Sequence, residues 1–186
     1  SDKRIFDYFA TEILEKLEAE TRDFLFQTAV FERVTVPMAE SLTGAVDAGR
    51  ILRELSERQC FIEAYAQEPP AYRYHPLFRE FLLARAPARF SNSELSEIRR
   101  KAALISEGAG LAEEAVNLFR ETGDWDRLVR VVASQARSLL GQGRNRTVEE
   151  WISPVPEEVW KKEPWLLYWL GLAVQPFRPA EGRAFF

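Results

Sequence analysis

Apolar residues recur at helical spacing along almost the whole chain, and this pattern is interrupted once, between residues 60 and 75. At 60–66 and again at 71–75, β-branched and aromatic residues follow one another in short runs, separated by Gln-Glu-Pro-Pro at 67–70. Short runs of this kind on either side of a proline-containing turn indicate the two strands of a β-hairpin. We therefore expect a mainly α-helical chain with one small β-hairpin.

The first part of the chain has the pattern of a winged helix. Apolar spacing predicts helices at about 5–17, 20–31, 37–44 and 47–59, and a further helix that begins at Pro76 and ends before Pro87. We expect Ile5, Phe6 and Phe9 to point inward from the first helix. The inward residues of the last one are expected to include Leu77 and Phe78. Helices followed by a hairpin predict a winged-helix domain over residues 1–87.

The remainder, residues 88–186, is expected to be a TPR-like arm of short α-hairpins. The predicted helices lie at 94–108, 111–121, 125–140, 148–151 and 164–174. Helix starts are indicated by Ser91 with Glu94, by Asp124 after Gly123, and by Thr147 with Glu150. All five tryptophans follow residue 120, whereas eight of the thirteen phenylalanines precede residue 88, so the two parts should have separate cores.

Residue usage argues against several functional classes. The longest apolar stretch, 165–174, is about half of the roughly 20 residues that a membrane span needs, and no basic leader precedes an apolar start. The chain has one cysteine, one histidine and one methionine, too few for a disulfide framework or a zinc site. We expect a cytoplasmic protein without a membrane partner, in which Cys60 is a small core residue.

Catalytic motifs are also missing from the sequence. It contains neither a nucleophile elbow nor a glycine-rich loop ending in Gly-Lys-Ser/Thr. Carboxylate pairs such as Glu113 with Glu114 fall in the first turns of helices, where they complement the helix dipole. We expect no catalytic residue, no metal and no cofactor belonging to this segment alone.

The charge distribution argues against direct nucleic-acid binding. The net charge is −4, with 11 basic and 15 acidic residues in 1–87 and 14 of each in 88–186. A nucleic-acid module normally has a basic face that neutralises phosphates. On the helix at 47–59, where a DNA-binding winged helix would have its recognition surface, Arg50, Arg53 and Arg58 each have a carboxylate four residues away.

One candidate binding site remains, at the end of the hairpin. Strand alternation places Tyr72 and Tyr74 on one face and Arg73 and His75 on the other, immediately before the helix that begins at Pro76. A helix N-terminus already favours an anion, so Arg73 and His75 would complete a phosphate-sized site. In the alternative interpretation His75 merely precedes or caps the helix, and Arg73 pairs with a wing carboxylate such as Glu63.

The C-terminal helix is apolar on all sides between Trp165 and Leu170. Together with the first residue, Ser1, and the apolar end Ala-Phe-Phe, this suggests a piece of a larger protein. We expect the apolar run, which includes Trp169, Phe177, Phe185 and Phe186, to be covered by self-association through these helices or by the tail folding back.

Several stretches resemble the MalT-like branch of the STAND regulators, which are ATP-dependent, LuxR-type transcriptional activators of bacteria. The specific stretch is 72–82, Tyr-Arg-Tyr-His-Pro-Leu-Phe-Arg-Glu-Phe-Leu. Weaker similarity is found at 6–10, 21–25, 110–116 and 122–125. The resemblance therefore covers almost the whole chain.

The resemblance implies a parent protein with a nucleotide-binding domain before this segment, and a TPR-like sensor and a DNA-binding helix-turn-helix after it. It implies that His75 contacts the ADP phosphates in the resting form, with Arg73 beside it, and that ATP or ADP is the cofactor of the parent. The expected function is regulatory coupling between the nucleotide-binding and sensor domains. The alternative is a free-standing winged-helix transcription factor with a helical effector domain.

Overall fold

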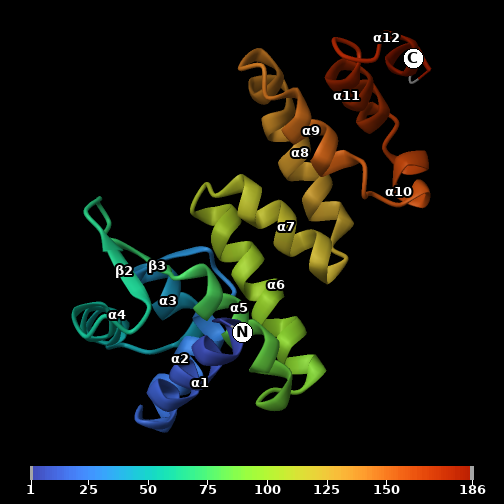
Figure 1. The fold of residues 1–186 in the computed structure, drawn as a ribbon. Coiled ribbons are helices and arrows are strands. Elements are labelled where there is room, and N and C mark those ends of the chain that lie inside the picture. Colours follow the sequence, from blue (N-terminus) through green and yellow to red (C-terminus); the bar gives the residue numbers. More distant parts are fainter. Residues whose placement is uncertain (1, 185–186) are drawn as a thin grey trace. The chain divides into compact units, whose positions relative to one another are not determined.

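The computed structural model describes the backbone of residues 2–184 and the side chains of residues 4–184. Within the chain, contacts divide it into two compact units, Ser1–Ile105 and Ser106–Phe186 (Figure 1). The predicted boundary at 87/88 falls in the short 3₁₀ turn η1 (Ala86–Ala88), whereas the division by contacts falls within helix α6. Both parts are mainly helical, as predicted.

The first unit combines helices with a small sheet. Its elements, in chain order, are α1 (Asp2–Glu15), α2 (Ala19–Thr28), β1 (Arg33–Thr35), α3 (Val36–Thr43), α4 (Ala48–Glu57), β2 (Ile62–Tyr65), β3 (Ala71–Tyr74), α5 (Pro76–Arg85), η1 and most of α6 (Asn92–Gly108). The predicted hairpin is β2 with β3. The strand β1 was not predicted, and it makes the sheet three-stranded.

In the sheet, β3 lies between β1 and β2 and is antiparallel to both. The register places Arg73 opposite Arg33 on one side and opposite Glu63 on the other. One face of the sheet is buried, with Val34, Tyr72 and Tyr74 at most 6% exposed. The hairpin is thereby fixed to the helical core.

Local sequence signals set several helix ends in this unit. The hydroxyl of Thr35 accepts a hydrogen bond from the Met38 N–H at the start of α3, and Gly44, at φ +77°, ends that helix. The predicted capping box before α6 is confirmed: Ser91 donates to the Glu94 carboxylate and accepts from the Glu94 N–H. These hydrogen bonds with Ser91 also lower the pKa of Glu94.

Polar contacts join elements that are far apart in the sequence. The guanidinium of Arg79 on α5 donates to the carbonyls of Val30 and Phe31, at 2.9 and 3.1 Å. The Lys101 ammonium on α6 donates to the carbonyl of Leu42 near the C-terminus of α3, at 2.9 Å. A cation at this position satisfies a carbonyl that the helix leaves free and complements its dipole.

The second unit is a succession of helices. These are α7 (Ala112–Thr122), α8 (Trp125–Gly141), α9 (Asn145–Ile152), α10 (Glu157–Lys162), α11 (Trp165–Val174) and α12 (Pro179–Arg183). Gly123, at φ +70°, ends α7, and the Asp124 side chain caps α8 by accepting from the Arg127 N–H, as predicted. Helix α8 packs against α7 and α9, and α9 packs against α11.

Some details of the sequence interpretation are wrong. Ile5 and Phe9 are each 56% exposed and Leu77 is 43% exposed. Within this unit α1 packs mainly against α5. This contact buries a narrower stripe of α1 than the apolar spacing suggested. Thr147 does not cap a helix with Glu150, because α9 already begins at Asn145 and Glu150 pairs with Arg146.

The expectation that the tail folds back over the C-terminal apolar run is confirmed in part. The tail turns back as α12, whose Gly182 is buried against Gln175 at the end of α11. Tyr168 and Phe177 stay 49% and 71% exposed, while Phe185 and Phe186 lie outside the described residues. In the described part of the chain, no helix is both long and apolar enough to cross a membrane.

Candidate anion site at the start of α5

The strand β3 separates its side chains as the alternation predicts. Tyr72 and Tyr74 are buried, Arg73 is half-buried and His75 is exposed. The buried Tyr74 hydroxyl lies 2.5 Å from the hydroxyl of Thr28, which itself donates to the Phe24 carbonyl. Because the Thr28 hydrogen is already used, Tyr74 is the donor, and this contact fixes the end of β3 against α2.

The backbone of His75 joins β3 to α5. Its N–H donates to the carbonyl of Phe61 at 2.7 Å, and its own carbonyl accepts from the N–H groups of Phe78 and Arg79, closing the first helical turn. Pro76 has no N–H, and its fixed φ suits the first helical position. His75 is therefore held as the residue that precedes the helix.

The imidazole of His75 makes no capping hydrogen bond. Its ring stacks on Phe6, with centroids 6.0 Å apart and an interplanar angle of 28°, and its centroid lies 6.3 Å from that of Phe61. Among the described residues, no protein group hydrogen-bonds either ring nitrogen of His75. The ring of this exposed residue is thus oriented by its aromatic neighbours.

The turn that supports this ring has an unusual backbone. Gln59 and Phe61 have φ values of +52° and +58°, a region that non-glycine residues rarely adopt. Phe61 is held there by ring contacts with Phe6 and Phe78, at 4.9 and 5.2 Å between centroids. Backbone strain of this kind persists where the surroundings fix the residue, and it concentrates at functional sites.

Arg73 has partners within the wing. The hydroxyl of Tyr65 hydrogen-bonds its guanidinium and raises its pKa, and the carboxylates of Glu32 and Glu63 act in the same direction. Glu63, the wing carboxylate named in the alternative interpretation, thus acts on Arg73 through its charge, without an ion pair between the two among the described residues. Arg73 and His75 do share one side of the strand, but only His75 has no polar side-chain partner among the described residues.

Two further expectations concern the arginines of α4 and the thiol of Cys60. Arg50 on α4 is bound by Asp47 and, at 3.0 Å, by Glu54; Glu54 and then Asp47 raise its pKa. Asp47 thus holds Arg50 instead of capping α4 with its side chain. Cys60 is half-buried, and desolvation raises the pKa of its thiol, which disfavours the reactive thiolate.

Sequence reasoning missed Arg79, which fixes the start of α5 to the end of α2. The residue lies in the Tyr-Arg-Tyr-His-Pro-Leu-Phe-Arg stretch, but its backbone-carbonyl partners at Val30 and Phe31 lie almost fifty residues earlier. The sequence signal that could have indicated this role is the position of an arginine on the half-buried side of an amphipathic helix. Among the described residues, no group of three His, Cys, Asp or Glu side chains could hold a metal ion.

The fold and this site define a winged-helix domain, and comparison with known proteins specifies its type. The family model of the MalT winged helix domain matches residues 10–94. The chain is 28% identical over 160 residues to the HTH-type transcriptional regulator MalT of Vibrio cholerae and 27% over 150 residues to that of Klebsiella pneumoniae, matches that cover 86% and 81% of this chain. The chain is thus similar to a segment of the MalT regulators, and its residues 10–94 match their winged helix domain.

A kinase shares the same region. The serine/threonine-protein kinase PknK of Mycobacterium tuberculosis is 26% identical over 181 residues, which is 96% of this chain and 16% of the kinase. The matches to the two MalT proteins cover 18% and 16% of their lengths. The chain thus spans about a sixth of the curated relatives that it matches.

Proposed function

We propose that this chain is the regulatory coupling segment of a bacterial ATP-dependent transcriptional activator of the LuxR-type STAND group. Its partners are the nucleotide-binding and sensor domains of the same longer chain, and ATP or ADP is the cofactor of that longer protein. The segment contributes no catalytic residue, and ATP hydrolysis belongs to the nucleotide-binding domain. The protein works in the cytoplasm, and residues 88–186 act as its TPR-like arm.

The observation that carries this proposal is the state of His75. Its ring is exposed, oriented by Phe6 and Phe61, and free to donate from a nitrogen at the start of α5. The helix N-terminus adds a positive partial charge at the same place. A phosphate group of ADP bound by a neighbouring domain fits both features, whereas Arg73, engaged by Tyr65, supports the site through charge alone.

The proposed mechanism is a two-state equilibrium. ADP held between the nucleotide-binding domain and His75 favours a closed resting form, while inducer and ATP favour an open form that oligomerises and activates transcription. Each ligand shifts the equilibrium only through its different affinity for the two forms. Losing the contact between His75 and ADP destabilises the closed form alone.

The test is transcription by the longer protein without added inducer. His75→Ala is expected to raise this basal activity, because the closed form loses a phosphate contact that the open form does not make. Arg53→Ala, which removes an exposed cation from α4, is the matched control and is expected to leave basal activity unchanged. Equal basal activity in wild type and His75→Ala would contradict the proposal.

The alternative, a free-standing DNA-binding winged helix, gains no support from α4, because Arg50 there is bound by two carboxylates.

A separate proposal concerns self-association through the C-terminal helices. This proposal rests on Tyr168 and Phe177, which remain exposed although α12 folds back. Light scattering at increasing protein concentration tests whether the chain self-associates.

A further inference from the structure

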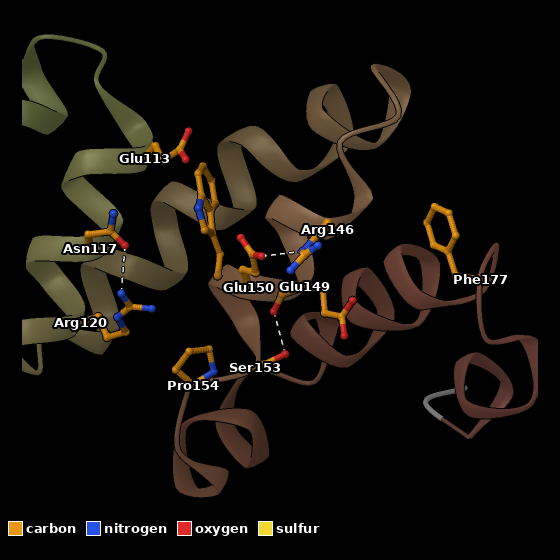
Figure 2. A pocket seen from close by; sticks show the side chains of 10 residues that line it. Glu113, Asn117, Arg120, Arg146, Glu149, Glu150, Ser153, Pro154 and Phe177 are labelled. Carbon is orange, nitrogen blue, oxygen red and sulfur yellow. Dashed lines mark hydrogen bonds and ion pairs between the residues drawn. The ribbon is translucent and has the colours of Figure 1, made fainter.

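The second unit contains an open groove between α7 and α9, with a volume of about 780 Å³. Figure 2 shows its two walls: Glu113, Asn117 and Arg120 project from successive turns of α7, and Arg146, Glu149 and Glu150 project from α9. Trp151, Pro154 and Phe177 add apolar surface to the lining. We call this feature the α7–α9 groove.

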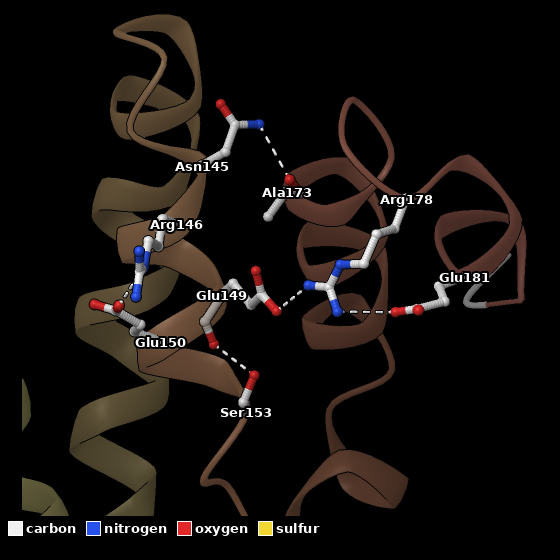
Figure 3. A network of polar contacts seen from close by, with 8 residues as sticks. All are labelled: Asn145, Arg146, Glu149, Glu150, Ser153, Ala173, Arg178 and Glu181. Atoms are coloured by element: carbon white, nitrogen blue, oxygen red, sulfur yellow. Dashed lines mark hydrogen bonds and ion pairs between the residues drawn. The ribbon is translucent and has the colours of Figure 1, made fainter.

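All three carboxylates of the groove have basic partners. The pairs are Glu113 with Arg144 at 3.2 Å, Glu150 with Arg146 at 2.9 Å, and Glu149 with Arg178. Figure 3 shows the last two, with Arg178 also bound to Glu181 at 2.9 Å. The acidic charge of the lining is therefore neutralised within the second unit.

Arg120 is different from these arginines. One of its terminal nitrogens donates to the side-chain oxygen of Asn117 at 3.1 Å. Among the described residues, no carboxylate lies within ion-pair distance of Arg120. Its remaining donors, together with the amide nitrogen of Asn117, are available in the groove. The groove thus contains a surplus cation beside an amide donor, and both lie on one stripe of α7.

The combination of Arg120 with Asn117 indicates which chemical groups a ligand of the groove should have. A guanidinium and an amide donor on neighbouring turns suit a carboxylate, which accepts several hydrogen bonds at once. The apolar surface of Trp151 and Pro154 suits an adjacent apolar side chain. A polyphosphate chain fits less well, because its successive charges need several cations, and the other arginine of the lining, Arg146, is already paired with Glu150.

We propose that the α7–α9 groove binds a peptide segment of a partner protein, in which an acidic side chain lies next to an apolar one. The acidic group binds Arg120 and Asn117, and the apolar group packs on Trp151 and Pro154. This role does not depend on His75 or on nucleotide, because the groove belongs entirely to the second unit.

The probe is an array of immobilised dodecapeptides of random sequence, in which each peptide containing Asp or Glu has a twin with Asn or Gln at those positions. The full chain of 186 residues is expected to bind acidic peptides that also contain a neighbouring apolar residue. Their neutral twins are expected to bind at least about tenfold more weakly, since a hydrogen-bonded charge pair is lost.

The variant Arg120→Gln isolates the proposed contact. Arg120 is exposed near the end of α7, so this substitution is expected to leave the fold intact, as circular dichroism can verify. The affinity for the selected acidic peptides, measured by fluorescence anisotropy, should fall at least about tenfold. The control Arg130→Gln removes an exposed arginine of α8 outside the groove and should bind like wild type.

Four results would overturn the proposal. The first is that no peptide binds at up to about millimolar concentration. The second is that acidic peptides and their neutral twins bind equally well. The third is that Arg120→Gln binds as wild type does or loses no more than Arg130→Gln. The fourth is that inorganic phosphate alone displaces the acidic peptides, which would make the groove a phosphate site.

Discussion

At the scale of single residues, the Tyr74 hydroxyl connects the sheet to the helical core. Tyr74 is fully buried at 1% exposure, and its hydrogen bond to Thr28 lies between β3 and α2. Burial raises the pKa of Tyr74 above the ordinary value of 10.0, while the contact with the Thr28 hydroxyl opposes this rise. The native state therefore keeps this phenol neutral where the unfolded chain ionises it.

Tyr74→Phe tests this contact and its pH dependence. Near neutral pH the variant is expected to lose about 1 kcal/mol of unfolding free energy, the usual net contribution of one hydrogen bond. Because the folded pKa is raised, the tyrosine stabilises fully below the unfolded pKa, and this contribution is lost as the pH rises above it. The difference between wild type and Tyr74→Phe should therefore shrink above about pH 10. Urea titrations measure it, and a constant difference would contradict the account.

The residue scale also shows what alternation can and cannot predict. The side of the strand taken by Arg73 and His75 was predictable because the period of a strand is two. The pairing of Arg73 with Tyr65 was not, because it depends on the register between β2 and β3 and on the side-chain conformations. The ring contacts of His75 with Phe6 and Phe61 were not predictable either, because these two residues are far apart in the sequence.

At the scale of elements, α12 is held to α11 by close backbone packing. A Cβ atom on Gly182 would lie 2.8 Å from the Gln175 Cα, closer than real Cβ atoms come. Arg178, just before α12, binds Glu149 on α9 and Glu181 on α12, as Figure 3 shows. Five residues alone cannot form a stable helix in water, so α12 depends on these contacts.

Gly182→Ala is expected to displace α12 and to destabilise the chain by about 1–3 kcal/mol, the usual cost of overpacking. The measurements are the free energy of unfolding and amide hydrogen exchange in 179–183. Gly141→Ala is the matched control, because a Cβ atom there meets no atom within 4 Å. It should be neutral or slightly stabilising. Equal effects of the two substitutions would show that α12 does not need the close contact.

The predictable elements were those with long periodic patterns. The helix α4 presents Ala48, Ile51, Leu52 and Leu55 to the core, as the spacing indicated. The elements that were missed are short: β1 has three residues, α10 has six and α12 has five. β1 is a strand only because it pairs with β3 almost forty residues later, and periodicity in one segment contains no such information.

The groove was missed for the same reason. Its charges lie on α7 and α9, and in the sequence each of these two helices has the pattern of an ordinary solvent-exposed face. The feature that distinguishes Arg120 is the absence of a carboxylate partner among the described residues, while Glu113 and Glu149 are paired with Arg144 and Arg178, which lie just before α9 and α12. Pairings between helices follow from packing and not from local spacing.

At the scale of the whole molecule, charge separates the proposed function from its alternative. With a net charge of −4, the chain of 186 residues is expected to bind duplex DNA no more tightly than the roughly 10⁻⁴–10⁻⁶ M of non-specific contacts at physiological salt. A gel-shift titration at about 150 mM salt measures this. Sub-micromolar binding would favour the DNA-binding alternative over the coupling segment.

The most direct measurement is the affinity of the longer protein for ADP, compared between wild type, His75→Ala and the control Arg53→Ala. Loss of a phosphate contact made only in the closed form should weaken ADP binding about 5- to 150-fold, the usual range of coupling between sites. The control should bind ADP as wild type does. An unchanged ADP affinity in a His75→Ala protein with a wild-type circular dichroism spectrum would contradict the role assigned to His75, and with it the coupling mechanism.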